Sequence, residues 1–73
     1  MDRTALLDLF AQARRRAEAG DLGIADQQKL IVDLEERGLD STQAETILDK
    51  LVKAQDFDMA EMERLLDQLD KPG

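Results

Sequence analysis

The sequence predicts an all-α fold, an antiparallel helical hairpin of two long helices at about residues 3–37 and 41–70. A helix-stop signal is followed at once by a helix-start signal near the middle of the chain, within residues 34–43. Apolar residues recur at heptad spacing on both sides of this turn. The chain has 73 residues, of which 37% are charged and 3% aromatic, a composition typical of a charged helical bundle. We therefore expect a single helical domain over residues 1–70 and a disordered tail at residues 71–73.

The first helix is predicted from about residue 3, where Asp2 or Thr4 can cap its N-terminus. Its apolar or small residues recur in alternating steps of four and three, which gives a packing seam at Leu6, Phe10, Ala13, Ala17, Gly20, Ile24, Gln27, Ile31 and Leu34. Each glycine inside a helix costs about 1 kcal/mol relative to alanine, so Gly20 and Gly23 mark a weak segment. Because the seam keeps its phase across this segment, we expect a continuous helix that is kinked or frayed there. A break at Gly20 with a new start at Asp21 is the alternative, and it would allow a three- or four-helix monomer.

The predicted turn is centred on Gly38, because glycine suits the left-handed conformation just past a helix end. Leu39 would then contact Leu34, the apolar contact of a Schellman stop. Asp40 can cap the second helix, with Gln43 as its capping-box partner three residues on. The serine or threonine that follows Asp40 could cap the helix instead.

The second helix repeats the seam at Ala44, Leu48, Leu51, Gln55, Asp58, Met62, Leu65 and Leu69. These residues follow the same alternating steps as those of the first helix, so the two stripes can pack together over most of their length. A bend at residues 56–58 is an alternative to a continuous helix, since Asp58 and Glu61 could form a fresh capping box.

Three residues on the predicted seam are polar: Gln27, Gln55 and Asp58. Polar residues at such positions often fix the register and partner choice of packed helices at some loss of stability. We therefore interpret these three as a candidate polar specificity layer. Counting outward from the turn places Gln27 opposite Leu51, and it places Gln55 and Asp58 near residues 20–24.

Residues 24–69 carry a sequence pattern in three parts. The parts are Ile24-Ala25-Asp26-Gln27 with Leu30-Ile31, then Leu34-Glu35, Gly38, Asp40-Ser41 and Ala44, and finally Leu51, Gln55, Phe57-Asp58-Met59-Ala60-Glu61 and Glu63-Arg64-Leu65-Leu66. This pattern resembles that of a group of small uncharacterised bacterial helical-hairpin proteins. The chain departs from the group at Asp58, where histidine is usual, and at Gly23, where helix formers are more common. The resemblance implies a continuous helical hairpin and no established activity.

Apolar residues beside the seam predict self-association. They are Leu7, Leu22, Leu30, Ile47, Val52, Met59 and Leu66. Two helices with a single seam would leave much of this wide apolar stripe in water. Packing against a second copy, as an antiparallel four-helix bundle, would bury it. We therefore expect a homodimer, and a further protein partner whose identity the sequence does not encode.

The charge distribution bears on the partners. The formal net charge is −7, with a net +1 over residues 1–20 and −8 over residues 21–73. Such an acidic surface disfavours nucleic acid, whose binding depends on clustered Lys and Arg. The consecutive Arg14, Arg15 and Arg16 splay around a helix, so they suit solvent or an acidic partner better than a phosphate backbone. No apolar run approaches the roughly 20 residues that cross a bilayer, and the start lacks the pattern of a signal peptide. We expect a cytoplasmic protein with no nucleic-acid or membrane partner.

The residue types that carry most catalytic chemistry are missing. The sequence has no His, Cys, Tyr or Trp, which removes the commonest general bases, thiol nucleophiles and zinc ligands. We therefore expect no enzyme activity, no metal and no cofactor. The predicted function is a small acidic protein–protein interaction module, an adaptor or regulatory subunit that self-associates. The alternative is an acidic decoy or inhibitor that occupies a basic, nucleic-acid-binding surface of a partner protein.

Overall fold

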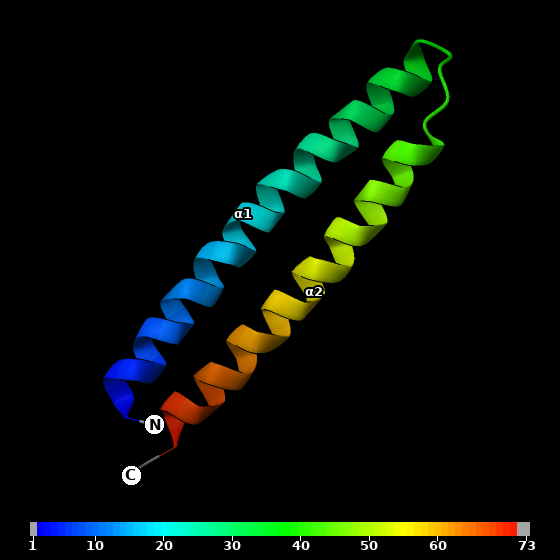
Figure 1. The fold of residues 1–73 in the computed structure, drawn as a ribbon. Coiled ribbons are helices and arrows are strands. Elements are labelled where there is room, and N and C mark those ends of the chain that lie inside the picture. The colour runs from blue at the N-terminus through cyan, green and yellow to red at the C-terminus, as the bar shows by residue number, and fades with distance from the viewer. Residues whose placement is uncertain (1, 72–73) are drawn as a thin grey trace.

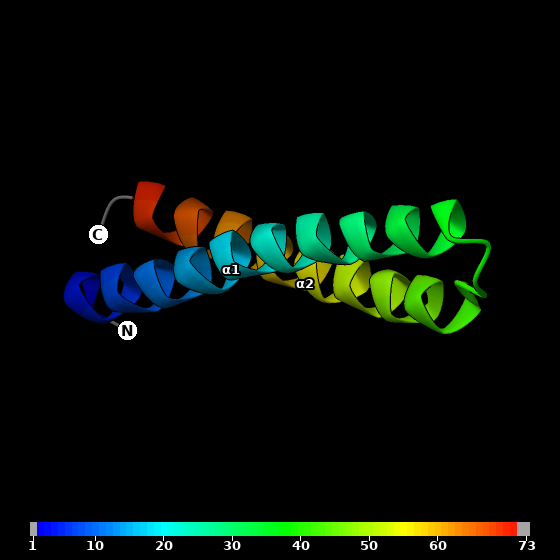
Figure 2. The ribbon, with the colours of Figure 1, turned by 90° about the horizontal axis from the view of Figure 1, so that it is seen from above.

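The protein forms a rod of two antiparallel α-helices, which confirms the predicted all-α hairpin. A computed structural model describes residues 2–71, in which α1 runs Arg3–Glu36 and α2 runs Thr42–Asp70. The rod measures 58 × 14 × 13 Å, and the first and last described residues lie together at the end away from the turn (Figure 1). Figure 2 shows the two helices crossing at a shallow angle, as long helices with a shared heptad seam do. Of the predicted tail, residues 72–73 lie outside the described residues.

α1 is one continuous helix through residues 20–23, so the alternative of a break there is wrong. Its N-terminus is capped by Asp2, whose Oδ1 accepts a 2.7 Å hydrogen bond from the backbone N–H of Ala5. Gly20 lies against Gln55 of α2, where an added Cβ would overlap the Gln55 Oε1 and lie 3.2 Å from its Cδ. The glycine therefore has a packing role that offsets its low helix propensity.

α2 is likewise a single helix, and it continues through residues 56–58 without interruption. No new helix starts here, so Asp58 and Glu61 do not form the capping box that suggested a bend. Asp58 lies on the seam side of the helix and forms an ion pair with α1 through its side chain, so it has a partner other than a backbone N–H.

The core follows the seam and is concentrated toward the chain ends. Its buried cluster consists of Leu6, Ala13 and Leu65, against which Phe10, Met62 and Leu69 pack. The large apolar seam residues predicted from the sequence are all buried or half-buried, whereas the apolar residues beside the seam are exposed. Among the described residues, however, no large side chain is completely buried. Two helices alone therefore do not enclose a core.

The turn after α1 has the geometry of a Schellman stop. Gly38 has a φ of +70°, the left-handed conformation that favours glycine. The Leu39 N–H donates to the Leu34 carbonyl at 2.9 Å, and the Gly38 N–H donates to the Glu35 carbonyl at 3.0 Å. These two bonds pair carbonyl groups that the end of a helix would otherwise leave unsatisfied.

The start of α2 differs from the predicted capping box. The helix begins at Thr42, and Ser41 at the N-cap position makes no side-chain capping bond. The Oδ1 atom of Asp40, one residue earlier, accepts two hydrogen bonds from Thr42. One comes from the Oγ1–H at 2.7 Å and the other from the backbone N–H at 3.0 Å. The side-chain bond first, and then the backbone bond, lower the pKa of Asp40 below its ordinary value of 3.8. The predicted pairing of Asp40 with Gln43 is therefore wrong, because Thr42 satisfies the carboxylate.

The two helices face each other in a register shifted from the predicted one. Residues 38–41 run back along the end of α1 before α2 begins (Figure 1). A non-helical residue advances up to about 3.3 Å along the rod and a helical one about 1.5 Å. The start of α2 therefore lies several helical residues farther from the tip of the turn than expected. Gln27 consequently lies at Ala44, to whose carbonyl its Nε2 donates at 2.9 Å. The predicted position opposite Leu51 is wrong for this reason.

Two glycine substitutions should have opposite effects on stability. Gly38→Ala places a Cβ in the left-handed region and should lower the free energy of unfolding by about 1–2 kcal/mol. Gly23→Ala is the control, because an added Cβ there meets nothing within 4 Å. It should raise the free energy of unfolding by up to about 1 kcal/mol through helix propensity. Urea denaturation followed by circular dichroism, at one chain concentration, measures both, and a change of the same sign in the two variants would contradict this account.

Replacing Thr42 by Val should raise the pKa of Asp40 toward 3.8, because the stronger of its two hydrogen bonds is lost. Since the folded-state pKa is lowered, the stabilisation it brings is present above about pH 3.8 and is lost as pH falls through the lower folded value. An NMR titration of the Asp40 carboxyl carbon measures the change. Thr46→Val is the matched control, because the Thr46 Oγ1–H donates to the Thr42 carbonyl at 3.1 Å and not to Asp40. An unchanged pKa in the Thr42 variant would contradict the assignment of this bond.

Candidate interaction site

The polar seam residues lie at three separate levels and do not form one layer. Gln55 lies beside residue 20, at the predicted level, and its Nε2 donates to Asp21 Oδ1 at 2.6 Å. Asp58 lies about one turn nearer the chain ends, where its Oδ1 is 3.6 Å from Arg16 Nε, so its predicted place near residues 20–24 is wrong because of the shifted register. Gln27 lies near the turn, bonded to backbone as described above. The three predicted polar seam residues therefore make three separate contacts spread along the hairpin, and their role in specificity stays a prediction.

The Gln55 contact is the least satisfied of the three. Its Oε1 atom is buried and has no hydrogen-bond partner among the described residues. A buried acceptor without a partner costs about 1–3 kcal/mol. Because Oε1 occupies the space that a side chain at Gly20 would take, the pair combines a close helix approach with an incompletely satisfied amide.

Leu22 lies on the outer face of α1, 70% exposed, so its predicted place beside the seam is wrong. The other apolar residues beside the seam fall on two opposite sides of the rod. We assign the seam residues to heptad positions a and d. The exposed apolar residues at position e are then Leu7, Val52, Met59 and Leu66, and those at position g are Leu9, Leu30 and Ile47. In an antiparallel pair, equivalent positions of the two helices come to the same side. The bond from Gln55 to Asp21, at position e, marks the first side, and the pair of Asp58 with Arg16, at position g, marks the second.

We call the first side the Met59 flank. Its apolar residues are Leu7, Val52, Met59 and Leu66, with exposed fractions between 40% and 48%. The three residues of α2 recur every seven positions, about 10.5 Å apart along the helix. Leu7 comes from α1 and lies level with Leu66, because Arg3, one turn earlier, donates from Nη1 to the Leu69 carbonyl at 3.1 Å. The Met59 flank is thus an apolar column that runs from Val52, near the middle of the rod, to the chain ends.

The second side, the Leu30 flank, comprises Leu9, Leu30 and Ile47. Leu30 and Ile47 line one hollow near the turn, which Leu34, Ala44 and Gln27 also line. Leu9 lies near the opposite end of the rod. The apolar surface on this side is therefore divided. Phe57, at the neighbouring position of α2, has 71% of its surface exposed.

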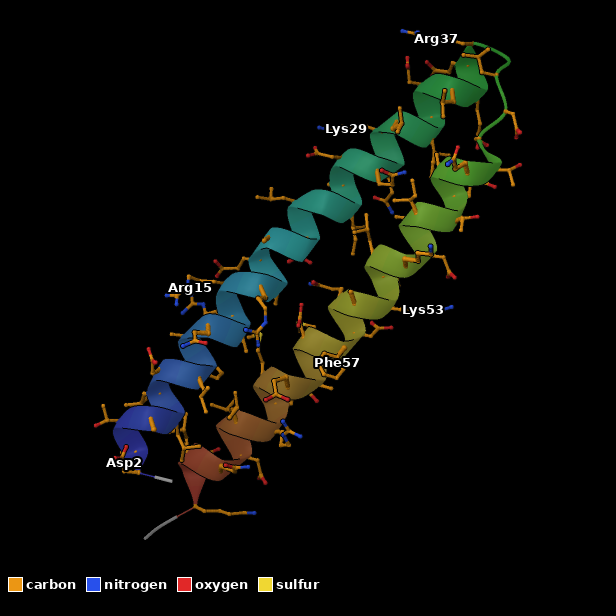
Figure 3. The ribbon with its side chains drawn as sticks, viewed as in Figure 1. Asp2, Arg15, Lys29, Arg37, Lys53 and Phe57 are labelled. Atoms are coloured by element: carbon orange, nitrogen blue, oxygen red, sulfur yellow. The ribbon has the colours of Figure 1, made fainter. Side chains whose placement is uncertain are left out.

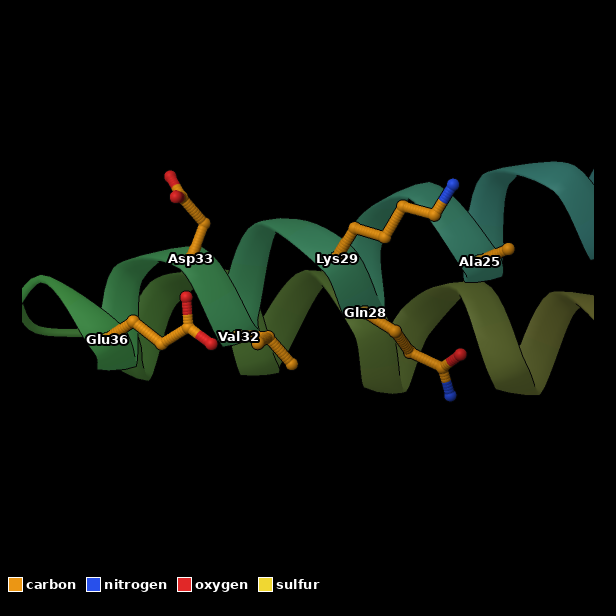
Figure 4. A pocket seen from close by; sticks show the side chains of 6 residues that line it. All are labelled: Ala25, Gln28, Lys29, Val32, Asp33 and Glu36. Carbon is orange, nitrogen blue, oxygen red and sulfur yellow. The ribbon is translucent and has the colours of Figure 1, made fainter.

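A further depression lies on α1 alone. It is lined by Ala25, Gln28, Lys29, Val32, Asp33 and Glu36. Figure 4 shows that all of these side chains come from α1 and that they diverge from one another. Residues three and four apart on one helix leave grooves of this kind between their ridges. We therefore interpret this depression as an ordinary helix groove and not as a ligand site.

Acidic side chains form a column on α2 next to the Met59 flank. The column consists of Asp49, Asp56, Glu63 and Asp70, which recur every seven residues. Asp49 pairs with Lys53 at 3.0 Å, whereas the other three form no ion pair with any described residue. Arg14 lies at position e of α1, on the same side of the rod, with Glu18 at 3.1 Å. Its neighbour Arg15 instead projects outward, as do Lys29 and Lys53 (Figure 3).

This acidic column is not among the features predicted from the sequence. Its spacing of seven is visible in the sequence, but its place beside the apolar flank follows only from the pairing of the helices. Within residues 2–71, no three acidic side chains are grouped so that they could hold a metal ion. Neither helix in this part of the chain has a stretch that is both long enough and apolar enough to cross a membrane.

Gly20→Ala should have an effect that depends on residue 55. In the natural chain the new Cβ displaces the Gln55 amide and breaks its bond to Asp21, which cancels or reverses the gain in helix propensity. In a Gln55→Ala background the same substitution should raise the free energy of unfolding by up to about 1 kcal/mol. The four proteins of this double-mutant cycle are compared by urea denaturation. An equal effect of Gly20→Ala in both backgrounds would show that the two residues are not coupled.

Comparison with known proteins adds no relative: no family model, no curated protein and no solved structure matches the chain. The resemblance of residues 24–69 to small bacterial helical-hairpin proteins therefore stays a prediction.

Proposed function

We propose that this protein is a small acidic protein–protein interaction module that self-associates through the Met59 flank and has no catalytic activity. The observation that carries the proposal is the flank itself, four apolar side chains aligned along one side of the rod and 40–48% exposed. Contiguous apolar surface on a small protein commonly marks an interaction site. Its alignment with the seam gives it the form of a second helix-packing surface.

The balance of buried and exposed apolar residues supports self-association. Among residues 2–71, three large apolar side chains, Leu6, Ile31 and Leu65, are buried, whereas eleven are exposed. Fully burying a leucine-sized side chain contributes about 1.5–3 kcal/mol, so covering a half-exposed one contributes roughly 1 kcal/mol. A symmetric pair covers the four flank side chains of both copies. The summed free energy of covering these side chains exceeds the lower estimate of the cost of association, about 4 kcal/mol. A weak homodimer in the form of a four-helix bundle is the expected result.

The Leu30 flank suits a different protein partner. In the proposed homodimer it faces away from the shared core, so the hollow between Leu30 and Ile47 stays open. Phe57 is 71% exposed on the same side of the rod, but it lies ten residues along α2 from Ile47 and so about 15 Å from the hollow. Exposed aromatic residues are typical of those that dominate protein interfaces. We propose that an apolar helix or strand of a partner binds on this side, which is the adaptor role.

The acidic column is the observation that favours the second candidate, an acidic decoy for a nucleic-acid-binding protein. One strand of DNA carries a charge about every 3.4 Å along the axis, whereas the acidic column carries one about every 10.5 Å. The charges of the acidic column are therefore spaced much more widely than those of a phosphate backbone. For this reason the interaction module is the better proposal. Binding of a decoy to a basic partner should weaken steeply between low and physiological salt, which an apolar contact should not.

Met59→Glu should abolish self-association, because it places a charge at the centre of the apolar column and next to the acidic column. We expect the homodimer Kd to rise by about 100-fold or more, leaving an 8.2 kDa monomer at tens of micromolar in sedimentation velocity. Leu30→Glu is the matched control, since Leu30 is 45% exposed and Met59 43%, on opposite flanks. It should leave self-association unchanged. A natural chain that is monomeric at tens of micromolar, or an equal loss in both variants, would refute the proposal.

A further inference from the structure

The geometry points to one arrangement of the two copies, an inference that rests on the self-association proposed above. The two hairpins pack through their Met59 flanks with both turns at the same end, so that α1 of each copy faces α2 of the other. Arg14 of one copy then lies between Asp56 and Glu63 of the second copy. The occupant of the flank is thus a second copy in the same orientation, held by apolar side chains and by charge pairs at their edge.

The pair of Arg16 and Asp58 fixes the level of Arg14 along the rod. Arg16 faces Asp58 across the hairpin, with 3.6 Å between their charged groups. Arg14 lies two residues nearer the N-terminus, which corresponds to residue 60 of the antiparallel α2. A two-fold axis along the rod keeps this level in the second copy. Residue 60 lies midway between Asp56 and Glu63, both of which are exposed and form no ion pair with a described residue.

The sign of the charges bears on the orientation of the two copies. When the turns lie at the same end, the helix that carries Arg14 faces the helix that carries the acidic column. When the turns lie at opposite ends, α2 faces α2, and the two acidic columns come together. Like charges brought together across an interface oppose association, whereas complementary ones direct it. The charges therefore favour turns at the same end.

The extent of the apolar surface bears on the same choice. On the Met59 side, the half of the rod near the turn carries Asp21, Gln28 and Glu35 on α1 and Glu45 on α2. At these positions the apolar residues lie from Val52, near the middle of the rod, to the chain ends, while Val32 lies farther out on α1 and is 52% exposed. Full overlap with turns at opposite ends would place the apolar half of each copy on the polar half of the other. With turns at the same end, apolar half meets apolar half over the whole length of the contact.

A charge-swap series tests the predicted pairing. Arg14→Glu should weaken the homodimer about tenfold in Kd, because it replaces attraction by repulsion in two symmetric places. Asp56→Lys combined with Glu63→Lys should weaken it similarly. The three substitutions in one chain should restore the Kd to within about threefold of the natural value. Arg15→Glu is the control, since it makes the same change in net charge on a side chain that points outward (Figure 3) and should leave the Kd unchanged.

A distance between the two turns tests the orientation. The sequence contains no cysteine, so Glu36→Cys, at the exposed end of α1, can carry a single spin label. Neighbouring helices in a bundle lie about 8–10 Å apart, so turns at the same end should give a distance below about 40 Å in pulsed electron paramagnetic resonance. Opposite ends should give about 50 Å or more, the length of α1.

The outcomes separate this inference from the function on which it rests. A short distance between turns together with rescue by the triple substitution supports the arrangement. A homodimer that shows the long distance, or that the triple substitution fails to rescue, overturns the arrangement and leaves self-association intact. A natural chain that stays monomeric in sedimentation overturns both.

Discussion

Two helices packed along one seam can shield only the side chains that face each other, and α1 and α2 carry apolar side chains well beyond that stripe. The buried cluster of Leu6, Ala13 and Leu65 is therefore thin, and no large described side chain is completely covered. The hairpin folds back because its turn is strongly encoded, yet folding back does not complete a core. The exposed flanks follow directly from this constraint, and so does the proposal that a second copy supplies the missing neighbour.

The seam itself is built from unequal partners. Toward the chain ends α1 presents small residues, Ala13, Ala17 and Gly20, while α2 presents larger ones such as Gln55 and Leu65. Small residues on one helix let the backbones approach and let long side chains of the other helix fill the space. At Gly20 this approach is so close that the Gln55 Oε1 is enclosed without a partner. The unpaired Oε1 lowers the stability slightly, but the close contact between Gly20 and Gln55 is one that only glycine permits. This contact favours the register in which the two residues face each other.

Much of the fold could be predicted from the sequence, because the decisive signals are local. The left-handed position of Gly38 and the bonds of Leu39 follow from residues within one helical turn. The register could not be predicted in the same way, since it depends on the path of residues 38–41 rather than on their number. The predicted capping box of Asp40 and Gln43 was wrong for a related reason. Thr42 offers both a hydroxyl and an N–H to the Asp40 carboxylate, and this competes with the expected capping box.

The candidate site was predictable only in part. The apolar residues beside the seam could be identified from spacing, but their division into two flanks requires the antiparallel pairing that the structure provides. On that division rests the proposal that the two sides have different uses. In a same-end pair built on the Met59 flanks, the hollow at Leu30 and Ile47 is left on the outer surface of each copy, near the shared turn end. Two identical sites at one end of a rod favour a partner with two binding segments, because the second contact becomes intramolecular and strengthens weak individual binding. Self-association and partner binding would then be coupled, although the two proposed contacts lie on opposite sides of the same small hairpin.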